Sequence, residues 1–104
     1  MKPVRIAREV ASELAEAAAW YETQRAGLGD ELVAAVEAVL ARIEARPTAG
    51  AMVPAAQDQD VRRIRVPRFP YHVVFVDLPD RVQVLAIAHW RRQPLYWRDR
   101  ADET

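Results

Sequence analysis

Two consecutive stretches with helical hydrophobic spacing, separated by a short break, constrain the fold of this chain more than any other feature. From residue 8 to about residue 24, apolar residues recur every three or four positions, which is the spacing of one helix face. The same spacing returns between residues 30 and 46, after the break Gly27-Leu28-Gly29. Because only about four residues connect them, the two helices are expected to pack antiparallel as a helical hairpin.

Stretches on either side of this hairpin have the pattern of β-strands. Residues 3–7 form one such stretch, and residues 61–69, 71–77 and 81–89 form three more. The last of these is the most apolar, so we expect it to be central in the sheet. Residues 47–60 have no periodicity and are predicted to form a loop.

The predicted fold class is α+β, with the element order β-α-α-β-β-β. The antiparallel helical hairpin has one apolar face, so we expect it to pack on one face of a small, mainly antiparallel four-stranded sheet. The other face of the sheet would then be exposed to solvent and partly basic. A chain of 104 residues is expected to form one domain, which we place at residues 1–97.

The end of the chain is predicted to change character after Trp97. Two large aromatic side chains, Tyr96 and Trp97, can each bury on the order of 150–250 Å² against the domain. Residues 98–104 carry no such side chain and are expected to be a frayed tail. Truncation after Trp97 is therefore expected to leave thermal stability almost unchanged.

Composition excludes several classes of protein. The chain has no Cys, which excludes a disulfide scaffold, a thiol nucleophile and a cysteine zinc site. Two His and no visible carboxylate cluster predict no metal site, and no cofactor motif is seen. The most apolar uncharged run, residues 82–90, is about half a membrane span, so no membrane segment is predicted. A cytoplasmic protein is the expectation.

The net charge of zero hides an asymmetry. Residues 1–60 contain six basic and ten acidic residues, whereas residues 61–104 contain nine basic and five acidic ones. Fourteen of the fifteen basic residues are Arg, the side chain suited to bidentate contacts with phosphate or carboxylate. A basic second half indicates an anionic partner, either nucleic acid or an acidic protein segment.

Three segments share a resemblance to one known group of proteins. They run from Trp20-Tyr21-Glu22 to Gly27-Leu28-Gly29, from Arg62-Arg63-Ile64 to His72-Val73-Val74-Phe75, and from Ala88-His89-Trp90-Arg91-Arg92 to Tyr96-Trp97. Together they resemble the RelE/ParE superfamily, the toxins of type II toxin–antitoxin modules. The resemblance covers residues 4–97 and includes the predicted order of elements.

The resemblance implies two different activities on one fold. RelE-like members cut mRNA in the ribosomal A site, and ParE-like members poison DNA gyrase. Both are silenced by an antitoxin whose C-terminal segment covers the toxin. The fold therefore leaves the target open, and the site residues have to be weighed.

RNA cleavage by the RelE-like route needs a proton acceptor, a proton donor and positive charge around the phosphate. The resemblance places an alternating basic pair at Arg63 and Arg65, and further site residues in the next strand and near the C-terminus. The catalytic candidates under this reading are Arg63, Arg65, His72, His89, Arg91 (or Arg92 in its place) and Tyr96.

This candidate set departs from the RelE-like pattern. The alternating pair is lysine in the ribosome-dependent cutter, whereas arginine has a pKa above about 12 and holds a phosphate without moving a proton. Only His72, His89 and Tyr96 then remain for proton transfer, and no carboxylate nearby in sequence orients either histidine. We therefore favour the ParE-like branch. A RelE-like endonuclease and a non-toxic relic that still binds its antitoxin stay open, and so does whether the protein is an enzyme.

Each candidate also has a purely structural interpretation. Arg63 and Arg65 can be the solvated face of a strand. His72 shares its predicted face with two valines, and His89 shares its predicted face with Leu85 and Ile87, so both can be packing residues. The aromatic residues Trp90, Tyr96 and Trp97 can stack on bases or attach the tail to the domain.

The resemblance and the charge pattern together predict the partner surfaces. Six arginines are expected to make the exposed sheet face and its edge positive: Arg62, Arg63, Arg65, Arg68, Arg91 and Arg92. We expect the antitoxin's C-terminal segment to be acidic and amphipathic and to dock there. Residues assigned to partner or nucleic-acid binding are Arg62, Arg68, Arg92, Trp90 and Trp97. The helical hairpin and the tail are the expected contacts with gyrase, while Trp20 and Tyr21 are expected to seal the hairpin against the sheet.

Overall fold

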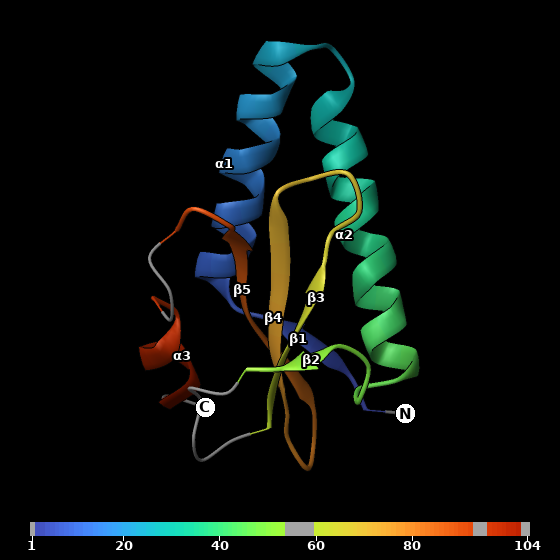
Figure 1. The fold of residues 1–104 in the computed structure, drawn as a ribbon, viewed down its shortest axis with the longest axis vertical. Coiled ribbons are helices and arrows are strands. Elements are labelled where there is room, and N and C mark those ends of the chain that lie inside the picture. The colour runs from blue at the N-terminus through green and yellow to red at the C-terminus, as the bar shows by residue number, and fades with distance from the viewer. Residues whose placement is uncertain (1, 54–59, 93–95, 103–104) are drawn as a thin grey trace.

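The computed structural model describes residues 2–53, 60–92 and 96–102 (Figure 1). Its elements follow the predicted order, with one extra strand and one extra helix. They are β1 (Val4–Ile6), α1 (Arg8–Gln24), α2 (Leu28–Ala45), β2 (Ala51–Met52), β3 (Val61–Arg65), β4 (Tyr71–Asp77), β5 (Val82–His89) and α3 (Arg98–Asp102). The α+β class and the helical hairpin are confirmed.

The turn between α1 and α2 is held by one carboxylate. Glu22 at the end of α1 accepts hydrogen bonds from the backbone N–H groups of Gly27 at 2.9 Å and Gly29 at 2.8 Å. These bonds satisfy donors at the start of α2 that have no partner within the helix. Gly27 adopts a φ of +88°, and a Cβ on Gly29 would lie 2.5 Å from the carbonyl oxygen of Ala18. Glycine at position 27 therefore permits the left-handed turn, and glycine at position 29 lets the two helices meet closely.

The sheet has five strands in the order β1-β5-β4-β3-β2, not four. β1 pairs in parallel with β5, and the other pairs are antiparallel. The additional strand, β2, has only two residues, and it falls in the segment predicted to be a loop. A strand this short has no period to detect, and it forms because Ala51 and Met52 pair with β3. Residues 54–59 of the predicted loop lie outside the described residues.

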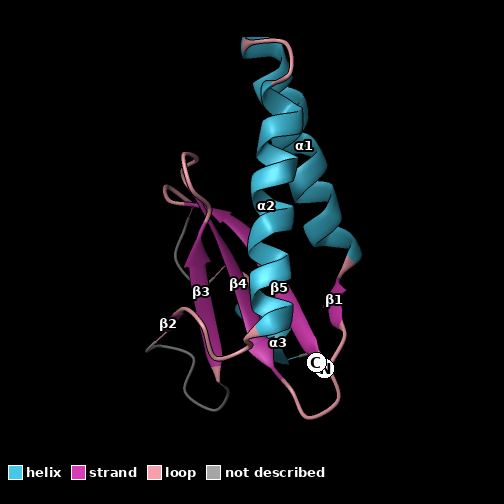
Figure 2. Cartoon of the chain, turned by 90° about the vertical axis from the view of Figure 1, so that its right-hand side faces the viewer, coloured by secondary structure: helices cyan, strands magenta, loops and turns pink. Residues whose placement is uncertain are grey.

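The helical hairpin covers one face of the sheet, as predicted. Its buried side chains pack on the strands in one cluster that includes Val10, Leu32, Val36, Phe75 and Val84. The hairpin also extends well past the ends of the strands (Figure 2). At this projecting end Tyr21 contacts Phe69 and Tyr71, whereas Trp20 is 58% exposed. The prediction that both aromatics seal the hairpin is therefore wrong for Trp20.

β5 contains an irregularity that changes which side chains share a face. Phe75 of β4 pairs with Val84, and Val74 pairs with Ala86, so Leu85 is an extra residue in β5. Such a β-bulge interrupts the strict alternation of side chains. Leu85 consequently packs on the face away from the hairpin, while Ile87 packs against the hairpin. The prediction that Leu85, Ile87 and His89 share one face is wrong for Leu85.

The face of the sheet away from the hairpin, which we call the open face, is only partly open. Trp97 is 4% exposed and packs there with Val74, Val76 and Leu85 in a second apolar cluster. The chain then continues into the short helix α3 (Figure 1). Residues 98–102 were expected to fray; instead Arg100 forms an ion pair with Glu13 at 3.0 Å, which fixes α3 to α1.

Across residues 2–53, 60–92 and 96–102, none of the helices combines the length and apolar character needed to cross a membrane.

Candidate functional site

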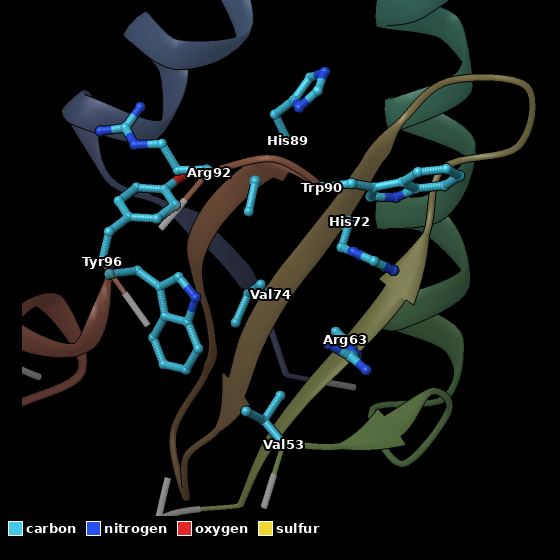
Figure 3. Close-up of a pocket in the computed structure, with 10 residues that line it drawn as sticks. Val53, Arg63, His72, Val74, His89, Trp90, Arg92 and Tyr96 are labelled. Carbon is cyan, nitrogen blue, oxygen red and sulfur yellow. The ribbon is translucent and has the colours of Figure 1, made fainter. Parts of the chain in front are cut away.

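The open face contains a hollow of about 200 Å³ beside Trp97 (Figure 3). Its apolar walls are formed by Val53, which follows β2, by Val74 of β4 and Ala88 of β5, and by Trp97. Its polar rim consists of Arg63, His72, His89, Trp90, Arg92 and Tyr96. None of the described residues that line it is acidic.

A cationic cluster formed by Arg63, Arg65, His72 and Trp90 occupies one side of this hollow. In the register of the sheet, Arg65 on β3 lies opposite His72 on β4. Side chains two residues apart on a strand point to the same face, so Arg63 and Arg65 both lie on the open face. The guanidinium carbon of Arg65 lies 4.4 Å from the centre of the Trp90 ring. The His72 ring lies 6.1 Å from the same ring. The structure thus places three of the catalytic candidates, Arg63, Arg65 and His72, side by side, with Trp90 from the partner-binding set next to them.

The electrostatics of the cluster disfavour the charged form of His72. Burial lowers the pKa of His72 below its ordinary value of 6.5, and the positive charges of Arg63 and Arg65 lower it further. Within the described residues, neither Arg63 nor Arg65 forms an ion pair, although Arg25, Arg62, Arg68, Arg81 and Arg100 all do. The cluster thus presents two guanidinium groups suited to an anion.

Tyr96 is not directed at the cluster as a proton donor. Its hydroxyl donates a hydrogen bond to Oε2 of Glu13 at 3.0 Å, and the Arg92 guanidinium stacks 4.1 Å from its ring centre. Burial, followed by the nearby Glu13 charge, raises the pKa of Tyr96 to about 12. A phenol in this state holds its proton at neutral pH, so its contact with Glu13 anchors the tail.

His89 lies at the end of β5 with its ring on the hairpin side. The ring contacts the edge of Tyr71 at 5.1 Å between centres, and Nδ1 accepts a hydrogen bond from the backbone N–H of Arg91 at 3.0 Å. In Figure 3 the His89 ring points away from His72. Both histidines that the sequence offered for proton transfer line the hollow, but the His89 ring packs on Tyr71 and the His72 ring lies near Trp90.

The remaining predicted arginines do not form one positive face. Arg62 points to the hairpin side, where it donates to the Thr48 carbonyl at 3.1 Å and pairs with Asp60. Arg68 sits in the β3–β4 turn beside α2, 3.8 Å from Glu31. The prediction that both belong to the open face is wrong, because strand alternation and the turn carry them to the other side. Arg91 and Arg92 are exposed after β5, as expected.

Two residues of this region could not be found from the sequence. Glu13 binds both Tyr96 and Arg100, yet in the sequence it is one of several glutamates on the polar side of a helix. Val53 lines the hollow because β2 carries the chain past β3, and the loop prediction missed this strand. In neither case does local sequence indicate the distant contact.

The site combines an apolar cavity with the guanidinium groups of Arg63 and Arg65 and the imidazole of His72. The Tyr96 hydroxyl is bound to Glu13, and the His89 ring packs on Tyr71. Among the described residues, no group of three or more His, Asp or Glu side chains could hold a metal ion. The arrangement suits an anionic, partly apolar partner.

The fold is of the class found in toxin–antitoxin proteins. It is similar to a chain of the chromosomal ParDE toxin–antitoxin system from P. aeruginosa, with a TM-score of 0.63 and 20% sequence identity over 86% of this chain and 96% of that chain. The family model of the ParE toxin of the type II toxin–antitoxin system parDE matches residues 4–94. The chain belongs to this family of ParE toxins. No curated protein matches the sequence.

Family membership confirms both the RelE/ParE resemblance and the preference for its ParE-like branch. The protein is the toxin of a type II toxin–antitoxin system, and its partner is the antitoxin of that system.

Proposed function

We propose that this toxin arrests growth by inhibiting DNA gyrase in the cytoplasm and that a cognate antitoxin neutralises it. One observation carries the choice of target. The cationic cluster contains two arginines but one group suited to proton transfer, His72, because the Tyr96 hydroxyl is bound to Glu13 and the His89 ring packs on Tyr71 with its Nδ1 accepting from the Arg91 N–H. RNA cleavage needs both an acid and a base, so the geometry supports a binding toxin over a nuclease.

The hairpin end and the tail are the proposed gyrase contacts. Tryptophan is strongly enriched among the residues that contribute most to interface affinity, and Trp20 is exposed close to the end of α1 that leads into the turn to α2. The hydrogen bonds from Gly27 and Gly29 to Glu22 hold that end in one conformation, which lowers the entropy lost on binding.

The antitoxin is proposed to dock on the open face through an acidic amphipathic C-terminal segment. Arg63 and Arg65 supply the positive charge, and Arg91 and Arg92 extend it towards the tail. Complementary charge mainly sets the association rate and the specificity of such a complex. Since the hollow is bounded by Tyr96 and Trp97, an antitoxin seated there also covers part of the tail.

The target is tested with purified components. We expect the toxin to block supercoiling of relaxed plasmid by DNA gyrase and to increase gyrase-linked DNA breaks, and we expect Trp20→Ala to weaken both effects. Ala34→Ser, on an exposed position of α2, is the control substitution. If the toxin instead cuts ribosome-bound mRNA at codon spacing, and Arg65→Ala abolishes these cuts, the target is translated mRNA, as in RelE-like toxins, and the gyrase proposal is wrong. Activity in neither assay would indicate a relic.

A further inference from the structure

The hollow on the open face lies beside two arginines that form no ion pair with any described residue. The apolar part is lined by Val53, Val74, Ala88 and Trp97, and the charged part is Arg63 with Arg65. Trp97 is 4% exposed, so its ring is a fixed wall and need not be ordered when a partner arrives. A volume of about 200 Å³ is of the size of one large side chain.

The two parts lie at a spacing that an extended peptide can match. Arg63 itself lines the hollow, and Arg65 is two residues further along β3, about 6–7 Å away at the usual strand rise. Alternate residues of an extended segment point to the same side with the same repeat. A peptide that places one side chain in the hollow therefore presents the next side chain on that face to the arginines.

The charges select the chemistry of the second residue. Arg63 and Arg65 have no carboxylate partner among the described residues, whereas Arg62 on the same strand pairs with Asp60. The Arg65 guanidinium stacks on the ring of Trp90, which is 48% exposed. This contact holds the guanidinium in place at the protein surface, where a partner can reach it. An incoming carboxylate would meet two preorganised cations and no described acid in the lining.

We propose that this site takes a two-residue anchor of the antitoxin: one large apolar side chain fills the hollow, and a carboxylate two residues away binds Arg63 and Arg65. The inference rests on the proposed docking of the antitoxin on the open face and specifies its contacts. A nucleic acid is disfavoured as the occupant, because the walls of the hollow are mainly apolar and a phosphate chain has no side chain to fill them.

The experiment measures the affinity of the toxin for the antitoxin encoded beside its gene, by calorimetry at about 50 and 300 mM salt. Ala88→Phe fills the hollow and is expected to weaken binding at least about 30-fold, the loss typical of a hot-spot contact. Arg63→Ala is expected to weaken it about 10-fold or more and to reduce its salt dependence. Ala34→Phe and Arg46→Ala, at exposed positions on and after α2, are matched controls expected to change affinity less than about 3-fold.

Unchanged affinity in Ala88→Phe, with a cooperative thermal melt showing that it folds, would overturn the apolar anchor. Unchanged affinity and salt dependence in Arg63→Ala would overturn the carboxylate contact, and this exposed substitution keeps the test valid if Ala88→Phe does not fold. A second step replaces each acidic residue of the antitoxin's C-terminal segment with its amide. At one of these antitoxin positions, the amide substitution is expected to weaken binding to wild-type toxin more than binding to the Arg63→Ala toxin. If every amide substitution weakens binding to the two toxins equally, the carboxylate contact with Arg63 is contradicted. No gyrase enters these measurements, so they fail or succeed independently of the target.

Discussion

The ion pair between Glu13 and Arg100 should make the last helix a part of the stable fold. Arg100 donates hydrogen bonds to both carboxylate oxygens of Glu13, at 3.0 and 3.1 Å, and to the Leu85 carbonyl at 2.9 Å. The two charged side chains are only 22% and 18% exposed. Solvent therefore screens this pair much less than an ordinary surface pair.

Arg100→Met removes all three hydrogen bonds while keeping most of the side-chain volume. Hydrogen bonds to charged groups contribute about 1.5–3 kcal/mol, so we expect the free energy of unfolding to fall by about 2 kcal/mol. For a domain of this size, that corresponds to a melting temperature about 8–16 °C lower. Truncation after Trp97 removes the same contacts and should have a similar effect, contrary to the expectation from the sequence.

Urea unfolding followed by circular dichroism provides the measurement. Glu13→Gln and the double variant Glu13→Gln/Arg100→Met complete a double-mutant cycle. The double variant should be little less stable than either single variant, which gives a coupling free energy of about 1.5 kcal/mol. Arg98→Met, at an exposed position of α3, is the control and should change stability by less than about 0.5 kcal/mol. If Arg100→Met unfolds like wild type, or if the two substitutions are simply additive, α3 is not held by this pair.

Three further predictions address the core, the turn and the cluster. Trp97→Ala should lower the free energy of unfolding by about 3–5 kcal/mol in the same urea experiment, because the ring is almost completely buried; a loss below about 1 kcal/mol would mean that the ring is not packed. Hydrogen bonds from two turn glycines lower the pKa of Glu22 below its ordinary value of 4.5, so its contribution to stability is complete above that pH and is lost as pH falls through the lowered value. Glu22→Gln should therefore reduce stability at pH 7 and flatten the acid side of the stability–pH curve, and an unchanged curve would contradict this assignment. His72→Gln should leave growth arrest in induced cells intact. If a folded His72→Gln variant no longer arrests growth, the nuclease activity would be favoured instead.

The sequence predicted the main elements because they depend on local patterns. Helical spacing located α1 and α2 to within about two residues at each end, and the enrichment of β-branched and aromatic residues located β4 with the bounds it has in the structure. β5 was expected to be central, and it is an inner strand between β1 and β4. These features follow from which residues are apolar, and no distant contact is needed to infer them.

The rest depends on partners far away in the chain. β2 forms by pairing with β3, and α3 is fixed by Glu13, which lies 87 residues before Arg100. The same holds for the candidate site: alternation placed Arg63 beside Arg65, but only the tertiary structure carries Arg62 and Arg68 to the hairpin side and binds Tyr96 to Glu13. Residue types indicated the chemistry, and the topology decided which of them meet.

The bulge at Leu85 makes the length of β5 and the orientation of its side chains independent of each other. Val84 and Ile87 are three residues apart, yet both face the hairpin, because Leu85 and Ala86 share the open face. Loss of Leu85 alone would restore plain alternation and leave Ala88 at the hollow, at the expense of a void under Trp97. Straightening the strand with Leu85 retained would instead exchange the faces of every residue that follows. An alignment gap at this position in a related chain is therefore compatible with an unchanged binding surface, whereas an ungapped chain without the bulge would present a different one.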